Sequence, residues 1–284
     1  MALQPDLLSG IPTLAEYDAL LRTPFFATIR SAASAFLEEN ADVLAPYRRR
    51  WVSDPLHQWS RQWEYPYTLA QLEKRIASVE TTRILDAGAG VTFFPYFLAD
   101  RHERIEITCA DADPTLAGIH AAIRNPSRNR IHSGEADLRA LPYSDRSFDA
   151  IYCLSVLEHT RQYDQIVEEF HRVLRPGGTL IVTFDISIDG EADISLQRAR
   201  RLIDLLERWF PATQGPSPSR ELPTEVSADA LTTTALARRD RTLMPWPHPV
   251  VCLLKALRRG RWPKRWGYTN LTCACHTFEK ARDE

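Results

Sequence analysis

The chain has 284 residues, of which 44% are hydrophobic and 25% charged, and its net charge is −2. These proportions are typical of a globular protein and exclude a disordered or collagen-like chain. The balanced charge also excludes a basic field over the whole molecule of the kind that nucleic-acid binding uses.

No apolar run approaches the roughly 18 residues that a membrane-spanning helix requires. The first residues, MALQPDLLSGIP, have no basic stretch before the apolar ones, so we expect no signal peptide. The five cysteines include no Cys-x-x-Cys pair. We therefore expect a reduced, cytoplasmic protein.

Residues 1–80 are predicted to form a helical, aromatic-rich N-terminal cap. Apolar residues recur at helical spacing from Leu69 to Val79. Before them, residues 47–67 are dense in large aromatic rings, and Pro46, Pro55 and Pro66 divide this segment into short pieces. The rings fit either packing of helices onto a sheet or a wall of a binding pocket, and packing is favoured for Trp59 and Trp63.

From residue 83 short apolar strands alternate with helical segments. Strands are predicted up to Asp86 and over 105–111, 147–155 and 178–185, and helices over 92–101, 114–124 and 162–174. Strands that alternate with helices indicate right-handed βαβ units and a parallel sheet.

The last hundred residues have a looser pattern. Residues 186–269 are interpreted as a substrate-side cap, which begins with an amphipathic helix from Leu196 to Trp209 and continues in a Pro/Ser-rich loop over 211–225. Residues 270–284 are predicted to give a final strand and a tail.

The segment from Ile84 to Thr92 carries the most informative pattern. A strand ends at Asp86, and Gly88 and Gly90 follow at alternate positions. Glycine allows positive φ and close approach of the backbone to a ligand. A dinucleotide fingerprint has a third glycine, whereas position 93 here is Phe, and the strand-end acid would repel a pyrophosphate. The pattern favours a ligand with a cationic group.

With LDAGAG, ITCADADP, CLSVLEH and LRPGGTLIVTFD in this order, residues 80–185 and the last strand resemble the class I S-adenosylmethionine-dependent methyltransferases. The resemblance implies an α/β fold: a Rossmann-like, doubly wound, mostly parallel seven-stranded sheet with helices on both faces. Residues 81–185 would be its cofactor-binding core, flanked by the helical N-terminal and C-terminal cap segments.

The resemblance also assigns roles to individual residues. Asp86 would accept a hydrogen bond from the methionine ammonium of the cofactor, Asp111 would bind the ribose hydroxyls and Asp137 the adenine amino group. The expected cofactor-binding residues are Asp86, Ala87, Gly88, Gly90, Asp111, Ala112, Asp137, Leu138, Leu154 and Ser155.

The acceptor side is less constrained by the sequence. His159 is the leading candidate for a catalytic base, and its alternative is a structural or cofactor-side role in the turn after the strand. Arg61 and Tyr65 are the candidate substrate residues in the aromatic segment. Cys273, Cys275 and His276 suggest a metal site, but strand alternation separates His276 from the two cysteines, and we expect no metal.

These features predict methyl transfer from S-adenosylmethionine to a small molecule, in bacterial natural-product or saccharide biosynthesis. Residues 238–265 carry nine basic residues against one acid, which leaves an anionic acceptor open. A nucleic-acid acceptor is disfavoured, and the oligomeric state is left open. The alternatives are a methyltransferase-like protein that binds the cofactor without transfer, and an NAD(P)-binding oxidoreductase.

Overall fold

The computed structural model describes residues 5–48, 54–77, 80–190, 194–211, 225–244 and 269–282. The strands of the described chain are β1 Thr82–Ala87, β2 Ile105–Asp111, β3 Ile131–Glu135, β4 Phe148–Leu154, β5 Leu174–Ser187, β6 Ile194–Ser195 and β7 Leu271–Glu279. The α-helices are α1 Leu14–Leu21, α2 Pro24–Glu39, α3 Ala41–Arg48, α4 Arg61–Ile76, α5 Phe94–Arg101, α6 Leu116–Ala122, α7 Tyr163–Val173, α8 Leu196–Trp209 and α9 Thr233–Ala237. Short 3₁₀ turns are η1 Pro55–His57, η2 Arg128–Arg130, η3 Leu157–His159 and η4 Arg241–Leu243.

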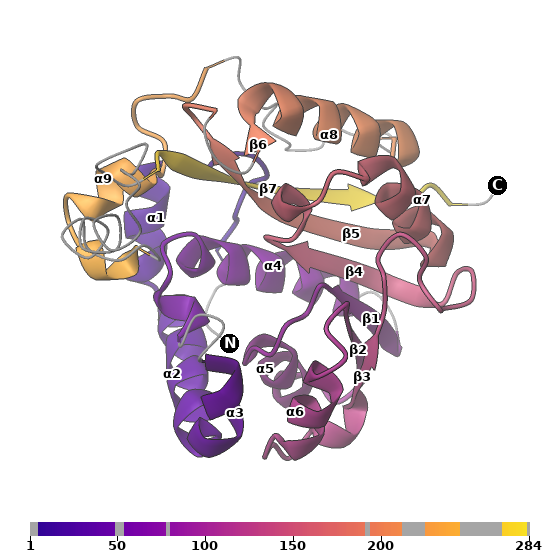
Figure 1. Cartoon of the computed structure of the whole chain (residues 1–284). Helices are drawn as coiled ribbons and strands as arrows, with labels where there is room; N and C mark the ends of the chain where they lie inside the picture. The colour runs from indigo at the N-terminus through magenta and orange to yellow at the C-terminus, as the bar shows by residue number, and fades with distance from the viewer. Residues whose placement is uncertain are drawn as a thin grey trace, which may run out of the picture.

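The strands form one seven-stranded sheet in the order β3-β2-β1-β4-β5-β6 (Figure 1). The pairs along this path are parallel, and β7 adds to β5 as an antiparallel strand. The predicted Rossmann-like, doubly wound and mostly parallel sheet is confirmed. Strand order reverses between β1 and β4, and ligands of such sheets bind at the carboxyl ends of the strands at this point.

Two buried clusters cover the two faces of the sheet. Alternate residues of each strand point to opposite faces, so Tyr152 lies in the cluster that includes α4 and α5, and Cys153 lies in the cluster with α7 and α8. Figure 1 shows α8 above β5 and β7, and α4 below them. The sheet is therefore covered on both faces, as predicted.

The N-terminal segment is not a separate layer. Helix α4 is buried continuously from Trp63 to Ala70 and packs directly on the sheet. Trp59 and Trp63 are 1% and 2% exposed, which fits the packing role favoured for them. The domain boundary proposed near residue 80 therefore falls between a covering helix and the strand next to it.

The C-terminal segments complete this arrangement. Strand β7 corresponds to the predicted final strand, and α8 corresponds to the predicted amphipathic helix. Cys273 and Cys275 lie in the α4-side cluster, while His276 stacks with Phe278 and has a pKa lowered to about 4 by burial. No group of three His, Cys, Asp or Glu residues suited to a metal occurs in the described ranges.

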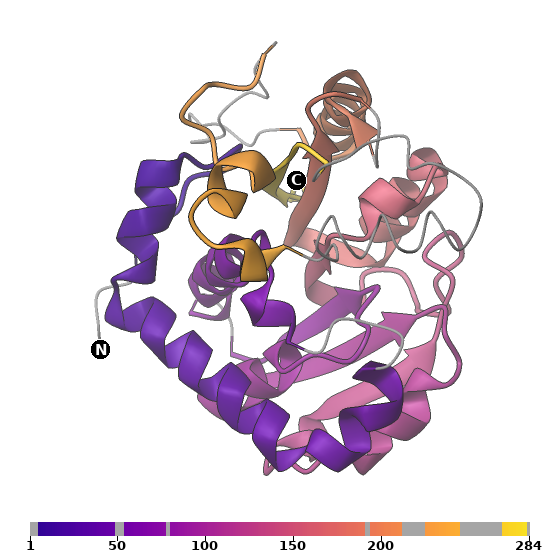
Figure 2. The ribbon, with the colours of Figure 1, turned by 60° about the vertical axis from the view of Figure 1, so that its left-hand side comes forward.

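Segments far apart in the sequence meet near α1. Figure 2 shows the orange α9 beside the indigo α1, and the two regions are joined by an ion pair between Arg239 and Asp18. The predicted loop 211–225 and the basic segment 238–265 lie mostly outside the described residues, which end at 211 and 244 before their gaps.

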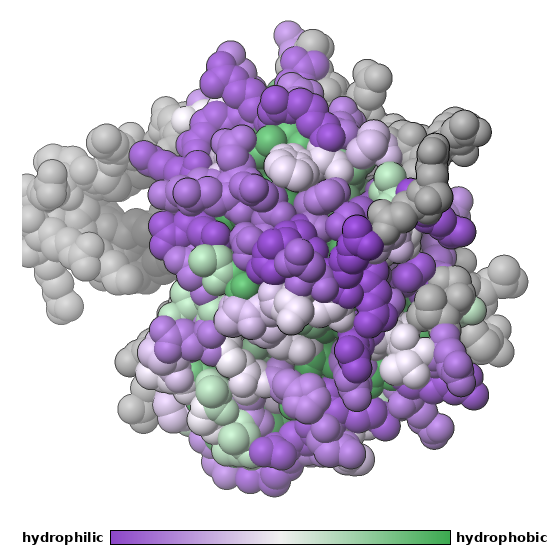
Figure 3. Space-filling view, turned by 90° about the vertical axis from the view of Figure 1, so that its right-hand side faces the viewer, coloured by the Kyte–Doolittle hydropathy of each residue, from purple (hydrophilic) through white to green (hydrophobic). Residues whose placement is uncertain are grey.

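Figure 3 shows one face as largely hydrophilic, with apolar residues in small separate patches. None of the helices in the described part of the chain combines the length and the hydropathy that a bilayer crossing requires.

Candidate cofactor site at the carboxyl edge of the sheet

A cavity of about 400 Å³ opens at the carboxyl edge of the sheet, beside the reversal between β1 and β4. A volume of this size is typical of a small-molecule site. Seven of the residues predicted from the sequence line it: Gly88, Asp111, Ala112, Asp137, Leu138, Ser155 and His159. Asp86, Ala87, Gly90, Leu154, Arg61 and Tyr65 are not among its lining residues.

The glycine turn after β1 contacts this cavity through Gly88. Gly88 and Gly90 have φ values of 77° and 53°, a region that side chains disfavour. A Cβ at Gly88 would lie 2.5 Å from Cγ2 of Val156, and one at Gly90 would lie 2.5 Å from the hydroxyl of Tyr47. Both glycines are therefore required by conformation and by space, as the sequence predicts.

Tyr47 is a wall of the cavity that the sequence interpretation did not assign. It lies on α3, and its hydroxyl accepts a hydrogen bond from the Val91 amide at 3.1 Å. Burial raises the pKa of this phenol. The N-terminal segment thus contributes directly to the cofactor-side cavity, through a ring that helical periodicity alone does not distinguish from its neighbours.

Asp86 lies beneath the turn. Its side chain is buried, and the Tyr152 hydroxyl donates a hydrogen bond to Oδ2 at 2.8 Å. Burial raises the pKa of Asp86 from 3.8 to about 8, against the opposing effect of the Tyr152 hydrogen bond. In the ligand-free chain this carboxyl is therefore largely protonated at neutral pH. Ala87, next to it, is fully buried in the core.

The raised pKa of Asp86 predicts a pH-dependent stability. The unfolded chain ionises this carboxyl near pH 4 and the folded chain near pH 8, so its contribution to stability is present below pH 4 and is lost as pH rises to about 8. Asp86→Asn cannot ionise. We expect its melting temperature, relative to the unsubstituted protein, to increase from about pH 5 to about pH 8.5 in thermal unfolding without ligand. Parallel melting curves across this pH range would contradict the prediction.

Asp111 ends β2 and presents its carboxylate to the cavity. Its Oδ2 accepts the Gly90 amide at 2.9 Å, and its Oδ1 accepts the Asp113 amide at 3.0 Å. Each oxygen has a second acceptor site beyond these bonds. Two backbone bonds therefore hold the carboxylate in one orientation and leave it able to accept two ligand hydroxyls. Ala112, also on the cavity wall, follows directly.

Asp137 and Leu138 line the opposite rim. Asp137 is exposed, and its carboxylate pairs with Arg139, whose hydrogen bonds lower its pKa to about 2. The carboxylate is thus ionised at neutral pH but already engaged by a neighbour. Leu138 is partly buried at the same rim.

The end of β4 is tied to the start of α4. Ser155 has a φ of 49°, unusual for a residue other than glycine, and its hydroxyl donates to Oε1 of Glu64 at 2.8 Å. Arg61 donates to the other oxygen of Glu64 and to the Ser155 hydroxyl. The Arg61 side chain is 18% exposed and that of Glu64 is fully buried. Arg61 therefore neutralises an interior carboxylate and contacts the cavity through Ser155. Leu154 precedes this turn as the last residue of β4.

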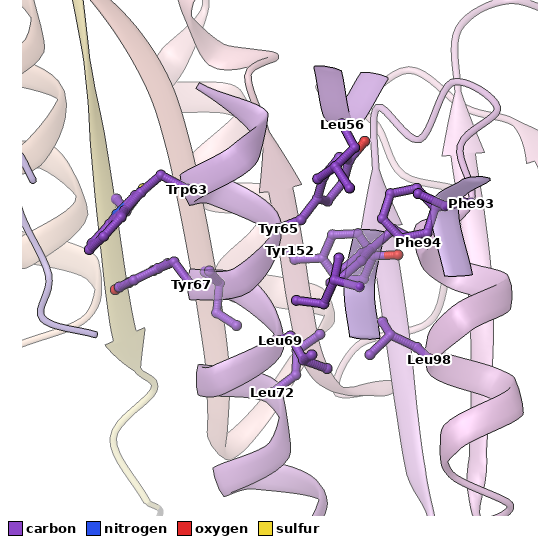
Figure 4. Close-up of a cluster of buried hydrophobic side chains, with 14 of the residues drawn as sticks. Leu56, Trp63, Tyr65, Tyr67, Leu69, Leu72, Phe93, Phe94, Leu98 and Tyr152 are labelled. Atoms are coloured by element: carbon purple, nitrogen blue, oxygen red, sulfur yellow. The ribbon is translucent and has the colours of Figure 1, made fainter. Parts of the chain in front are cut away.

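Tyr65 lies in the buried core and is not among the residues that line the cavity. It is 3% exposed, and its ring packs against Phe93 and Phe94 with centroid distances of 5.0 Å each (Figure 4). Its predicted place in the acceptor pocket therefore stays a prediction, since the ring has no surface at the described cavity. Successive residues of α4 face different neighbours, and the ring of Tyr65 fills the space between α4 and α5.

His159 ends η3 and is exposed at the cavity. Its neighbour Glu158 is buried, and its Oε1 accepts the Asp185 amide at 3.3 Å. Burial, with Glu64 nearby, raises the pKa of Glu158 to about 8. Of the two residues, only His159 is open to a ligand.

Comparison with known proteins finds methyltransferases, by a domain family and by individual relatives. Residues 85–182 match a methyltransferase domain family. A tRNA U34 carboxymethyltransferase of Syntrophotalea carbinolica is 24% identical over 213 residues, covering 74% of this chain and 64% of that protein. A demethylmenaquinone methyltransferase of Deinococcus radiodurans is 33% identical over 100 residues, covering 35% of this chain and 42% of that protein. The chain thus spans less than two thirds of the length of either relative.

A solved structure shares the fold over most of the chain. The [4+2]-cyclase SpnF superposes with a TM-score of 0.52 and 21% identity, covering 85% of this chain and 94% of that one. The described site also fits S-adenosylmethionine, because Gly88 lines the cavity with backbone alone and Asp111 has acceptor capacity for a ribose. Residues 85–182 are therefore a methyltransferase domain, which supports the resemblance of the chain to the class I S-adenosylmethionine-dependent methyltransferases.

Proposed function

We propose that the protein transfers a methyl group from S-adenosylmethionine to a small-molecule acceptor, in the cytoplasm and in bacterial natural-product or saccharide biosynthesis. The observation that carries the proposal is the cavity between the Gly88 turn and the Asp111 carboxylate at the sheet reversal. The net charge of −2 supports a small acceptor over a nucleic acid. An anionic acceptor stays a prediction, because most of segment 238–265 lies outside the described residues.

The residues of the cavity divide the work of binding. Asp111 accepts hydrogen bonds from the ribose hydroxyls, and Ala112 and Leu138 pack on the adenine faces. Asp137 accepts a hydrogen bond from the adenine amino group, in competition with Arg139. At Gly88, which has no side chain, the methionine part of the cofactor lies close to the backbone, beside Leu154 and Ser155. Asp86, below the turn, ionises when the ammonium group of the cofactor arrives, because a nearby cation lowers the pKa of a buried carboxyl.

The bound cofactor supplies an activated methyl group for an in-line displacement. The chain's task is then to hold the acceptor atom in line and to remove its proton where that atom is O or N. His159 is our candidate base, because it is exposed at the cavity while Glu158 beside it is enclosed. Arg61 is proposed to act at the acceptor side through Ser155.

Calorimetry tests the cofactor class. We expect S-adenosylmethionine and S-adenosylhomocysteine to bind, with about 2.7 kcal/mol of stabilisation at a hundredfold excess over Kd, and NAD and NADP not to bind. Binding of NAD without binding of either sulfur ligand would overturn the assignment.

The acceptor class is identified by a transfer assay, in which label from S-adenosylmethionine is counted separately in the small-molecule, RNA and protein fractions of a bacterial extract. Binding without any label transfer would favour a methyltransferase-like binding protein.

His159 has its own test. His159→Ala is expected to slow label transfer at least about tenfold, because proton removal from the acceptor loses its base, while the Kd for S-adenosylhomocysteine stays within about twofold. Transfer at the unsubstituted rate would leave His159 without a catalytic role. A parallel loss of S-adenosylhomocysteine affinity would instead indicate its alternative role on the cofactor side.

A further inference from the structure

A buried histidine reaches the glycine turn from behind the cavity. His120 of α6 is 5% exposed, and its Nε2 lies 2.9 Å from the carbonyl oxygen of Gly90. Its Nδ1 lies 2.8 Å from the hydroxyl of Tyr96. A carbonyl oxygen can only accept, so Nε2 carries the proton and donates to Gly90. Nδ1 of the neutral ring is then an acceptor, and the Tyr96 hydroxyl donates to it.

His120 and Tyr47 hold one peptide group of the turn from its two sides. The peptide between Gly90 and Val91 is planar, so its carbonyl and its amide point in opposite directions. The carbonyl accepts from His120, and the amide donates to the Tyr47 hydroxyl at 3.1 Å. Rotation of this peptide would break both bonds.

The same glycine also orients the ribose-binding acid. The Gly90 amide donates to Oδ2 of Asp111 at 2.9 Å. His120 and Asp111 therefore bond the two backbone polar groups of the same residue, since His120 holds the Gly90 carbonyl and the Asp111 carboxylate accepts the Gly90 amide, and Tyr96 in turn holds His120. Asp111 faces the cavity, whereas His120 and Tyr96 are not among the residues that line it.

Packing holds the Tyr96 end of these contacts in place. Tyr96 is 1% exposed, and its ring stacks on Phe36 of α2 at a centroid distance of 5.1 Å. The Tyr96 ring also stacks on the ring of His120, with a centroid distance of 6.1 Å and an interplanar angle of 23°. Burial lowers the pKa of His120, in agreement with the neutral ring that the hydrogen bonds require.

We propose that His120 is a positioning residue of the cofactor site, which fixes the backbone conformation of Gly90 and through it the orientation of the Asp111 carboxylate. The inference rests on the proposed function, since it concerns binding of the cofactor's ribose. It adds to the site a residue that has no contact with the ligand cavity.

The test compares two substitutions at the same position. Glutamine can place an amide nitrogen near the position of the histidine Nε2, whereas methionine fills similar space without a donor. We expect His120→Met to weaken S-adenosylhomocysteine binding about tenfold in calorimetry and His120→Gln to restore it to within about threefold. Unchanged affinity in His120→Met, or equal losses in both variants, would overturn the proposal. Failure of the unsubstituted protein to bind either sulfur ligand would instead refute the proposed function.

A second pair of variants serves if His120→Met does not fold. Tyr96→Phe removes the hydroxyl that fixes the His120 tautomer, and Tyr67→Phe removes another buried hydroxyl, which bonds Ser9 at 2.8 Å and Thr277 at 2.7 Å. We expect both to lower the melting temperature, but only Tyr96→Phe to weaken S-adenosylhomocysteine binding, by about threefold. Equal affinities for the two variants would show that the contact between Tyr96 and His120 acts on stability alone.

Discussion

Gly88→Ala is expected to weaken binding of S-adenosylhomocysteine at least about 30-fold. The substitution places a Cβ 2.5 Å from Cγ2 and 2.9 Å from Cγ1 of Val156, at a φ of 77°. The left-handed conformation costs a residue with a side chain roughly 1–2 kcal/mol, and the overlap adds to this cost unless the turn moves. Because Gly88 and Val156 both line the cavity, any such movement changes the surface that the cofactor contacts.

Gly118→Ala is the matched control for this change. Gly118 lies in α6, and a Cβ there would meet no atom within 4 Å. Alanine is also the better helix former, so we expect equal or higher stability and an unchanged Kd. Calorimetry on both variants checks the prediction, with thermal unfolding as the measure of folding. Equal affinities of Gly88→Ala and the unsubstituted protein would show that the cofactor does not approach this turn.

Asp111→Ala is expected to cost about 2–4 kcal/mol of cofactor binding, or roughly 30- to 700-fold in Kd. The loss has two parts. The ribose loses its two charge-assisted hydrogen bonds, and the amides of Gly90 and Asp113 lose the acceptor that now orients them. Competition calorimetry with S-adenosylhomocysteine measures the change.

Asp137→Ala provides the contrast. This carboxylate is exposed and already paired with Arg139, so its substitution is expected to weaken binding only a few-fold. A larger loss for Asp137→Ala than for Asp111→Ala would reverse the two roles and assign the main polar contact to the outer rim.

The central part of the fold was predictable because its signals are local. Strands such as β4 are apolar runs of a length typical of buried strands. The turn after β1 is marked by two glycines, which are typical of positive φ values and of a backbone that another group approaches closely. Strand β3 was missed because it lies at the sheet edge, is half exposed and contains Gly134, which together remove the usual apolar signal.

Several site residues depend on contacts between distant segments, and these are beyond local pattern. Tyr47 and His120 approach the same peptide from α3 and α6, and nothing in their own neighbourhoods of sequence indicates it. Likewise, the sequence places Tyr65 in an aromatic segment, but only the packing of α4 against α5 determines which way its ring points.

The antiparallel β7 has a consequence for how the protein is made. It pairs with β5 from Thr179 to Ser187, yet it comes more than 80 residues after that strand. Its other edge bonds Gly10, near the beginning of the chain. During translation, the edge of β5 therefore stays uncovered and the N-terminal segment lacks its partner until residues 271–279 have left the ribosome. Since an uncovered strand edge invites pairing with other chains, the emergence of β7 is also the step that protects the nascent protein from aggregation.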